Sequence, residues 1–304
     1  MDLAPLDPTV GAWTLELPAR YRSSDTLAYH GRDPLSLTER VEAATLFKAL
    51  WVAGREAVVE VAFGSSQVTW RLHGPALDRA ALEAVQARVI RMLGLAGDPA
   101  AFERFVAADP AFHALIAPRL GLRIPLTPDV WESVVWAILG QQVNLAFAYS
   151  MRRRLTALCG GNLLLGLRPH PTAAAVAALE PADLTPLQIS RGKADYLVGV
   201  ARLVDSGALA LEAMPLGEAA PAALALSAVR GIGPWTTHYV LMRGCGFTDC
   251  VPLGDAGLTL ALQRHLGLDH RPTAKETALL MAPFAPYRSL ATFHLWASLK
   301  GVPA

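Results

Sequence analysis

The hydrophobic pattern of this chain changes near Pro110, and that change constrains the fold more than any other feature. Before it, short segments alternate apolar and polar residues, which is typical of half-buried β-strands. After it, apolar residues recur at helical spacing in one segment after another. We therefore predict an α+β fold, with a small β-rich domain at residues 1–110 followed by an all-α domain at residues 111–304.

The first hundred residues contain several strand signals. "WTLELP" is one strand candidate, and "AVVEVAFG" and "QVTWRLHG" flank Gly64-Ser65-Ser66, which predicts a hairpin. "RVEAATLFKALWVAG" fits a strand or a helix, because its alanines and leucines suit both. "ALDRAALEAVQARVIRMLGL" has helical spacing and ends at a glycine, so we expect a helix there.

The second part of the chain predicts helix after helix. "TPDVWESVVWAIL" has Thr127 as an N-cap candidate and Pro128 in the first turn. We expect that helix to break at Gly140-Gln141-Gln142 and a new one to follow in "VNLAFAYSMRRRLTAL". Further helices are expected within residues 173–179, 191–207, 220–230, 234–244, 256–266, 274–284 and 288–299.

Composition excludes several classes of protein. Hydrophobic residues make up 53% of the chain and charged residues 17%, so a large core is expected rather than general disorder. No run of about 18 apolar residues predicts a membrane span. Three cysteines are too few for a four-cysteine metal site and suit a reducing cytoplasm. The acidic, proline-broken start is unlike a signal peptide. We expect a cytoplasmic protein, associated with the nucleoid if it is bacterial.

The segment "LALSAVRGIGPWTTHYVLMRG" predicts two helices joined by a glycine hairpin. Gly231 and Gly233 allow a tight turn and a close approach of a ligand to the backbone, and Ile232 can point into the core. Pro234 suits the first position of the second helix, whose amides and dipole favour an anion such as phosphate. An ordinary glycine corner between two helices explains the same spacing equally well.

Four ordered motifs together resemble one family. The hairpin continues through Tyr239, Met242-Arg243, Asp249 and Pro252 to Asp255 and Leu258; "AILGQQVNLAFA" and "RGKADYLVGVA" precede it and "RSLATFHLWASL" follows. This order resembles the helix–hairpin–helix/Gly-Pro-Asp superfamily of DNA glycosylases, and within it the alkylpurine branch of 3-methyladenine type II enzymes. The resemblance covers roughly residues 110–300, and residues 1–100 match the small preceding domain more loosely.

The resemblance implies an enzyme that hydrolyses the N-glycosidic bond of a damaged base. Asp255 holds the position of the family's catalytic aspartate, where a carboxylate stabilises the positively charged sugar and orients water. Its alternative role is an ordinary N-cap of the next helix. Trp235, Tyr239 and Trp296 resemble the aromatic walls of the base pocket, and their alternative role is core packing.

The resemblance also implies a DNA-binding surface. Its candidate residues are Gly231, Gly233, Pro234 and Thr236 of the hairpin, Gln141 and Gln142 at the helix break, and Arg191 and Lys193. One glutamine would enter the gap left by the flipped base, although a plain polar helix break fits both. Arg152, Arg153 and Arg154 are weaker candidates, since three arginines on a helix are usually solvated. We expect no cofactor and no catalytic metal; a structural cation bound by the hairpin carbonyls is implied only as an option.

We therefore predict a monofunctional DNA glycosylase that excises alkylated purines of the 3-methyladenine and 7-methylguanine type. Trp235 stands where strand-cutting relatives carry a lysine nucleophile, and no lysine lies between Met214 and Ala274. Oxidised or deaminated bases are the alternative substrates, and a non-catalytic duplex-DNA-binding module is the alternative class. A hydrolase of free nucleosides is less favoured. The expected partner is double-stranded DNA with damaged bases, bound by a monomer.

Overall fold

The computed structural model describes residues 11–299, which form two compact units. The first unit contains the described residues up to Leu93 together with Leu139–Leu209. The second contains Gly94–Ile138 together with the described residues from Ala210 onward. Each unit thus joins two separate stretches of chain, and the expected domain boundary near residue 110 stays a prediction.

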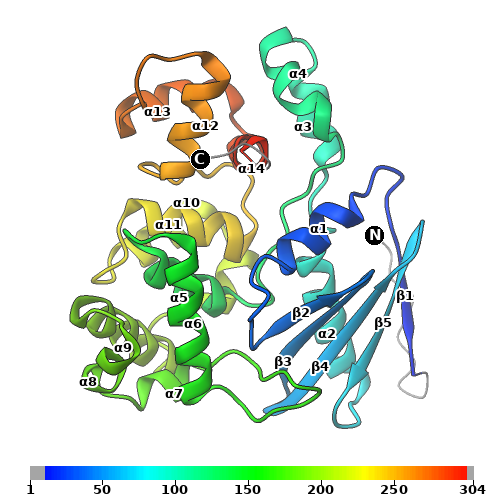
Figure 1. The fold of residues 1–304 in the computed structure, drawn as a ribbon, viewed down its shortest axis with the longest axis vertical. Coiled ribbons are helices and arrows are strands. Elements are labelled where there is room, and N and C mark those ends of the chain that lie inside the picture. Colours follow the sequence, from blue (N-terminus) through cyan, green and yellow to red (C-terminus); the bar gives the residue numbers. More distant parts are fainter. Residues whose placement is uncertain (1–10, 300–304) are drawn as a thin grey trace. The chain divides into compact units, whose positions relative to one another are not determined.

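The first unit contains an antiparallel sheet with the strand order β1-β5-β4-β3-β2 (Figure 1). The expected hairpin joins β4 to β5, with Phe63 opposite Val68 and the Gly64 amide bonded to the Gln67 carbonyl at 2.8 Å. Residues 40–54, which fitted either a strand or a helix, contribute to β2 and β3. The strands are β1 (Trp13–Glu16), β2 (Glu39–Glu42), β3 (Thr45–Val52), β4 (Arg55–Phe63) and β5 (Gln67–His73).

Helices complete the first unit. The predicted helix before residue 95 is α2, which begins after the N-cap Asp78 and buries Leu82, Val85 and Val89. Ser190 caps α9, whose first turn carries Arg191 and Lys193. The helices of this unit are α1 (Ser23–His30), α2 (Arg79–Met92), α6 (Leu145–Cys159), α7 (Ala173–Ala177), α8 (Pro181–Leu184) and α9 (Arg191–Asp205), with a 3₁₀ turn η2 (Thr185–Leu187).

A buried ionic network lies inside this unit, around Glu39 of β2. The His30 Nδ1 donates to Glu39 Oε2 at 2.9 Å, Lys48 Nζ lies 3.8 Å from the same oxygen, and Arg152 Nη1 lies 3.6 Å from Oε1. Arg152 is 6% exposed and also donates to Thr38 Oγ1 at 3.0 Å. The expectation of a solvated arginine face is therefore wrong for Arg152, because a distant strand supplies its carboxylate.

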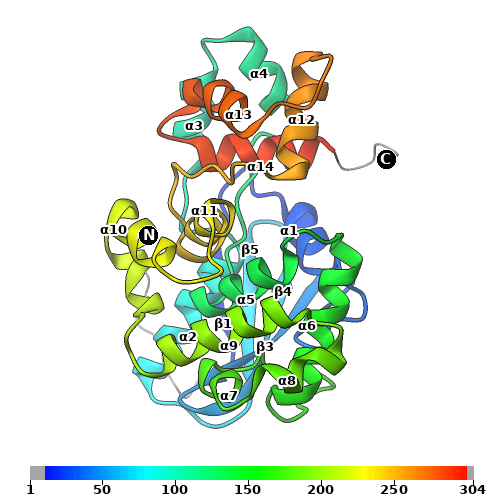
Figure 2. The same ribbon diagram turned by 90° about the vertical axis from the view of Figure 1, so that its left-hand side faces the viewer.

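The second unit is helical. Its core joins α3, α12 and α14 through fully buried side chains that include Phe102, Leu258 and Leu295. Figure 2 shows α12 beside α14. Its helices are α3 (Pro99–Val106), α4 (Pro110–Ile116), α10 (Ala219–Ser227), α11 (Pro234–Val240), α12 (Ala256–Leu266), α13 (Ala274–Met281) and α14 (Arg288–Ser298). Shorter turns are η1 (Ala117–Arg119), η3 (Leu211–Leu216), the π-helical η4 (Leu241–Cys245) and η5 (Ala282–Phe284).

Helix α5 (Val130–Gly140) corrects one prediction. Thr127 is not its N-cap and Pro128 is not in its first turn, because the helix begins at Val130. The Asp129 carboxylate accepts the Glu132 amide at 2.8 Å, which makes Asp129 the cap. Glu212 Oε1 accepts the amides of Val130 and Trp131 at 2.8 and 3.1 Å. The break expected after α5 is confirmed, since the helix ends at Gly140.

Two expectations concern membrane spans and targeting signals. No helix within residues 11–299 has the length and apolar character needed to span a membrane. The prediction that the start of the chain is unlike a signal peptide falls mostly on residues 1–10, which lie outside the described residues.

Candidate active site

Asp255 stands at the start of α12, where the local sequence fixes its carboxylate. Gly254 adopts a left-handed conformation with φ of 85°, which turns the chain into the helix. Asp255 then caps α12, and its Oδ1 accepts the Leu258 amide at 2.7 Å. The alternative role predicted for Asp255, that of an N-cap of the next helix, is therefore confirmed. A cap and a catalytic group can be the same carboxylate, so this role leaves the proposed chemistry open.

Two tryptophans donate hydrogen bonds to this carboxylate. The indole Nε1 of Trp235 on α11 donates to Asp255 Oδ2 at 3.0 Å. The indole Nε1 of Trp296 on α14 donates to Asp255 Oδ1 at 2.8 Å. Together with the Leu258 amide, three N–H donors hold both carboxylate oxygens. This arrangement fixes the orientation of the carboxylate relative to both indole rings.

Tyr239 completes an aromatic cluster around the carboxylate. Its ring stacks on Trp235 with 5.4 Å between ring centroids, and it lies tilted against Trp296 at 6.3 Å. Tyr239 is buried, whereas both tryptophans and Asp255 are only partly buried. The structure thus brings together Asp255, Trp235, Tyr239 and Trp296, the four residues that the sequence assigned to catalysis and to the base pocket.

The predicted glycine hairpin joins α10 to α11. Gly231 has φ of 91°, a left-handed conformation that favours glycine, and Ile232 between the glycines is only 4% exposed. Pro234 is the first residue of α11, and the Gly233 carbonyl accepts the Thr237 amide at 2.9 Å. The turn therefore has the predicted form.

Thr236 differs from the other hairpin candidates in its burial. The whole residue is only 2% exposed, so it offers little surface for a direct contact with DNA, and its predicted role stays a prediction. A cation bound by the hairpin carbonyls stays a prediction.

The loop before α12 is tied to α14. Arg288, the first residue of α14, donates from Nε and Nη2 to the two oxygens of Asp249 at 2.6 and 2.7 Å. These hydrogen bonds hold the pKa of Asp249 below its usual range, although burial opposes them. Ser289 Oγ accepts the Cys250 amide at 3.0 Å. Because α14 also carries Trp296, these bonds fix the loop that leads to Asp255 relative to that tryptophan.

His238 has a structural role in the same loop. Its Nδ1 accepts the Val251 amide at 3.3 Å, so the ring helps to hold the same loop. Burial, and then the charge of Arg288, lower the pKa of His238, whereas the Asp249 charge raises it. The described residues contain no group of three or more His, Cys, Asp or Glu side chains placed to hold a metal ion.

The remaining predicted DNA-binding residues lie in the first unit. Gln142 is exposed, with a left-handed backbone of φ 53°, and Gln141 is partly buried. Arg191 is exposed at the start of α9. Lys193 Nζ donates to the Leu139 carbonyl at 2.7 Å, and burial lowers its pKa. This bond ties α9 to the end of α5, next to the two glutamines, which the sequence did not predict.

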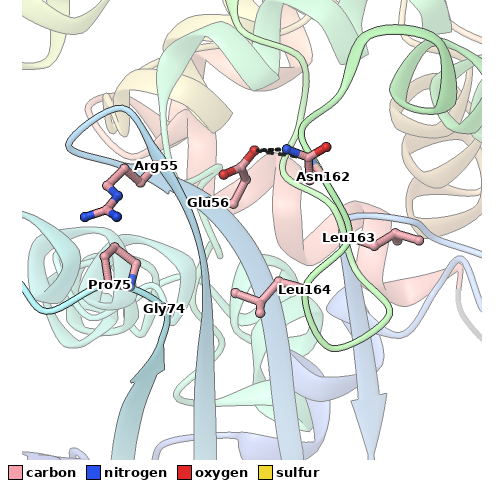
Figure 3. Close-up of a pocket in the computed structure, with 7 residues that line it drawn as sticks. All are labelled: Arg55, Glu56, Gly74, Pro75, Asn162, Leu163 and Leu164. Carbon is pink, nitrogen blue, oxygen red and sulfur yellow. Dashed lines mark hydrogen bonds between the residues drawn. The ribbon is translucent and has the colours of Figure 1, made fainter.

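A hollow of about 290 Å³ lies elsewhere in the first unit, beside β4 and the loop after α6. Figure 3 shows Glu56 and Asn162 pointing toward each other there, and the Asn162 Nδ2 donates to Glu56 Oε1 at 2.9 Å. Arg55, Pro75 and Leu164 also line it. None of the predicted site residues lies there, so this hollow is separate from the candidate active site.

The sequence did not reveal two features of the site. The first is the indole donors, because a pattern of aromatic residues does not tell which atoms face a carboxylate. The second is the pairing of Arg288 with Asp249. Asp249 belonged to a recognised motif, and apolar spacing predicted that Arg288 begins a helix. Neither signal indicated that the two residues lie close together.

Comparison with known proteins identifies the family. The model described as HhH-GPD superfamily base excision DNA repair protein matches residues 135–286, and that of the AlkA N-terminal domain matches residues 14–129. A DNA-3-methyladenine glycosylase of Bacillus subtilis is 28% identical over 93% of this chain and 95% of its own length. DNA-3-methyladenine glycosylase 2 of Escherichia coli is 32% identical over 61% of this chain and 64% of its own length.

A solved structure supports the same fold. The 3-methyladenine DNA glycosylase of Archaeoglobus fulgidus superposes with a TM-score of 0.82 and 23% identity, covering 94% of this chain and 98% of that protein. At this identity the likeness concerns the fold alone. The predicted resemblance and the α+β fold, with a sheet followed by a helical domain, are confirmed. The chain belongs to the HhH-GPD superfamily of base excision DNA repair proteins, in its AlkA-like branch, and is a DNA glycosylase, a hydrolase of N-glycosyl bonds.

Proposed function

We propose that this glycosylase is monofunctional and excises alkylated purines, such as 3-methyladenine and 7-methylguanine, from duplex DNA. The observation that carries the proposal is the Asp255 carboxylate, oriented by two indole donors within an aromatic cluster. Cleavage of the N-glycosidic bond leaves positive charge on the sugar. A carboxylate held in one orientation stabilises that charge without rearranging during the reaction, and it can also orient the attacking water.

The aromatic cluster supports the choice of lesion. A purine alkylated at N3 or N7 carries a positive charge, and the electron-rich faces of tryptophan and tyrosine attract cations. Alkylation also makes the base a good leaving group, so a strong general acid beside it is not needed. The names of the relatives from Bacillus subtilis and Escherichia coli, both DNA-3-methyladenine glycosylases, agree with this substrate class.

The absence of a lysine supports a hydrolytic mechanism. Trp235 follows Pro234 at the position of the lysine nucleophile in strand-cutting relatives, and its indole donates to Asp255. Without an amine nucleophile beside the sugar, no Schiff base with DNA can form there. Borohydride should therefore trap no covalent adduct between the protein and DNA that contains the lesion; a trapped adduct would contradict the monofunctional assignment.

The proposed partner is double-stranded DNA with damaged bases, bound by a monomer. The hairpin at Gly231 and Gly233 would contact the phosphate backbone, and Arg191 and Lys193 would add cationic contacts. Gln142 is the better wedge candidate of the two glutamines, because it is exposed where Gln141 is partly buried. A polar wedge can hydrogen-bond the base left unpaired when its partner flips out. Association with the nucleoid would follow from this partner.

The experiment that tests the proposal is release of free bases from duplex substrates by the full chain. We expect release of 3-methyladenine and 7-methylguanine from methylated DNA, with slower release of 8-oxoguanine and hypoxanthine. Preferential release of an oxidised or deaminated base would replace the proposed lesion. Tight duplex binding without release of any base would favour a binding module, and sedimentation of the same samples tests the monomer.

A further inference from the structure

Gly257 is the second residue of α12, two positions after Asp255. Its backbone is helical and does not adopt the left-handed conformation that would require glycine. At an ordinary helical position alanine is favoured over glycine, because glycine loses more backbone freedom on folding. The backbone therefore gives no reason for a glycine here, and the surroundings of the missing side chain have to provide one.

A Cβ at position 257 would press on both ends of one hydrogen bond. It would lie 3.2 Å from Asp255 Oδ1, 3.4 Å from Trp296 Nε1 and 3.3 Å from Trp296 Cδ1. Asp255 Oδ1 and Trp296 Nε1 are the acceptor and the donor of the 2.8 Å bond between the carboxylate and the indole. Contacts this short are tighter than ordinary van der Waals contacts, so the indole or the carboxylate would move by a few tenths of an ångström.

The neighbouring bonds leave little room for such a movement. Asp255 Oδ1 is also held by the Leu258 amide at 2.7 Å, and Oδ2 by Trp235 at 3.0 Å. Trp296 belongs to α14, whose Leu295 is fully buried in the core of the second unit. A displaced carboxylate would therefore lose part of its hydrogen bonding, while a displaced indole would shift a wall of the aromatic cluster.

We propose that Gly257 is a positioning residue for base excision: its missing side chain leaves the space in which Trp296 and Asp255 meet. The inference rests on the proposed role of Asp255. It predicts that a single methyl group lowers the rate of base release while stability changes little, because the helix preference for alanine offsets the cost of the crowded contact. Loss of rate without loss of stability separates positioning from a general effect on folding.

The test compares Gly257→Ala with Gly199→Ala. Gly199 lies inside α9, where an added Cβ meets nothing within 4 Å, so it is a matched glycine without the proposed role. Single-turnover release of 7-methylguanine from methylated duplex DNA gives the rate constant and the reaction amplitude separately. Thermal unfolding gives Tm, and titration of the same duplex gives Kd.

For Gly257→Ala we expect a rate constant reduced about tenfold or more, with the amplitude and Kd of the wild type and a Tm close to it. Gly199→Ala should keep the wild-type rate constant. An unchanged rate constant for Gly257→Ala would overturn the inference, and so would a loss of amplitude alone, which reports fewer folded molecules. If the wild type released no alkylated base, the proposed function would fail instead.

Discussion

The indole Nε1 of Trp296 donates to Asp255 Oδ1 at 2.8 Å, so a side chain of α14 is bonded to the N-cap residue of α12. Trp235 makes the equivalent bond to Oδ2. The tryptophans that form the walls of the proposed base pocket therefore also hold the proposed catalytic carboxylate. In the proposed mechanism these two side chains would couple substrate recognition to charge stabilisation, so substitutions have to be designed to separate the two roles.

Trp296→Phe removes the N–H donor and keeps an aromatic face. Hydrogen bonds to charged groups contribute about 1.5–3 kcal/mol, so the single-turnover rate of base release should fall about tenfold or more. The matched control is Trp51→Phe, because the Trp51 indole donates to the His170 carbonyl at 2.9 Å in the first unit. That control should lower Tm without changing the rate. Full activity of the folded Trp296→Phe or Trp296→Ala protein would contradict the role of Trp296.

Trp235→Leu tests the attraction of the cluster for a cationic base. The substitution weakens the hold on Asp255 for every substrate, so the ratio of two rates isolates the cation–π contribution. We expect release of cationic 7-methylguanine to fall about threefold to thirtyfold more than release of neutral hypoxanthine, which corresponds to about 0.5–2 kcal/mol. The measurement is a pair of single-turnover rates for each protein. An equal fall for both bases would show that charge recognition does not reside at Trp235.

Glu39→Gln should destabilise the first unit without touching the candidate active site. Burial raises the pKa of Glu39, but Lys48, the hydrogen bond from His30, and Arg152 outweigh it and hold that pKa well below its usual range. Removing the carboxylate leaves buried cations uncompensated, which costs about 3–5 kcal/mol. Urea denaturation at pH 7 measures the loss. The control, Glu83→Gln, removes a surface pair with Arg79 and should change stability little.

The same carboxylate predicts a dependence of stability on pH. A lowered native pKa means that the unfolded chain binds the proton more tightly, so this stabilisation is complete above the unfolded value of about 4.3. It is lost as pH falls further toward the native pKa. The difference in unfolding free energy between wild type and Glu39→Gln should therefore shrink below about pH 4.5. A difference that stayed constant down to pH 3 would contradict the network.

Arg191→Met tests the predicted phosphate contact on α9. A protein that loses one phosphate contact should show a slope of log K against log salt concentration that is less steep by about 0.9. Arg79→Met on α2 is the control, since it removes an exposed cation outside the predicted DNA-binding residues. Equilibrium binding to an undamaged duplex at several salt concentrations gives both slopes. An unchanged slope for Arg191→Met would remove this residue from the proposed surface.

Local signals made part of this structure predictable. The hairpin at Gly64, the turn at Gly231 and the cap at Asp255 each depend on a few adjacent residues, and the structure has all three. The predicted start of α5 was wrong because Asp129, also a residue type that caps helices, is the cap instead of Thr127. Glu212, far along the chain, also binds the first amides of the helix. A single sequence does not reveal such a distant partner.

Arg152 and Trp296 illustrate the same limit at the level of side chains. Three successive arginines on a helix are usually solvated, which predicted an exposed Arg152, but the carboxylate that pairs with it belongs to β2. Sequence resemblance assigned Trp296 to a pocket wall, yet the direction of its N–H follows from the packing of α14 on α12. Periodicity predicts which face of an element is apolar, whereas contacts between distant elements decide what a polar atom meets.

The central claim is that the Asp255 carboxylate drives base release. Asp255→Asn is the most direct test, because asparagine caps helices about as well as aspartate and keeps one oxygen for the Leu258 amide and an indole. We would measure single-turnover release of 7-methylguanine from methylated duplex DNA, with equal folding checked by circular dichroism. A fall of about a hundredfold or more, with duplex binding retained, is the predicted result. Release at the wild-type rate would contradict the account.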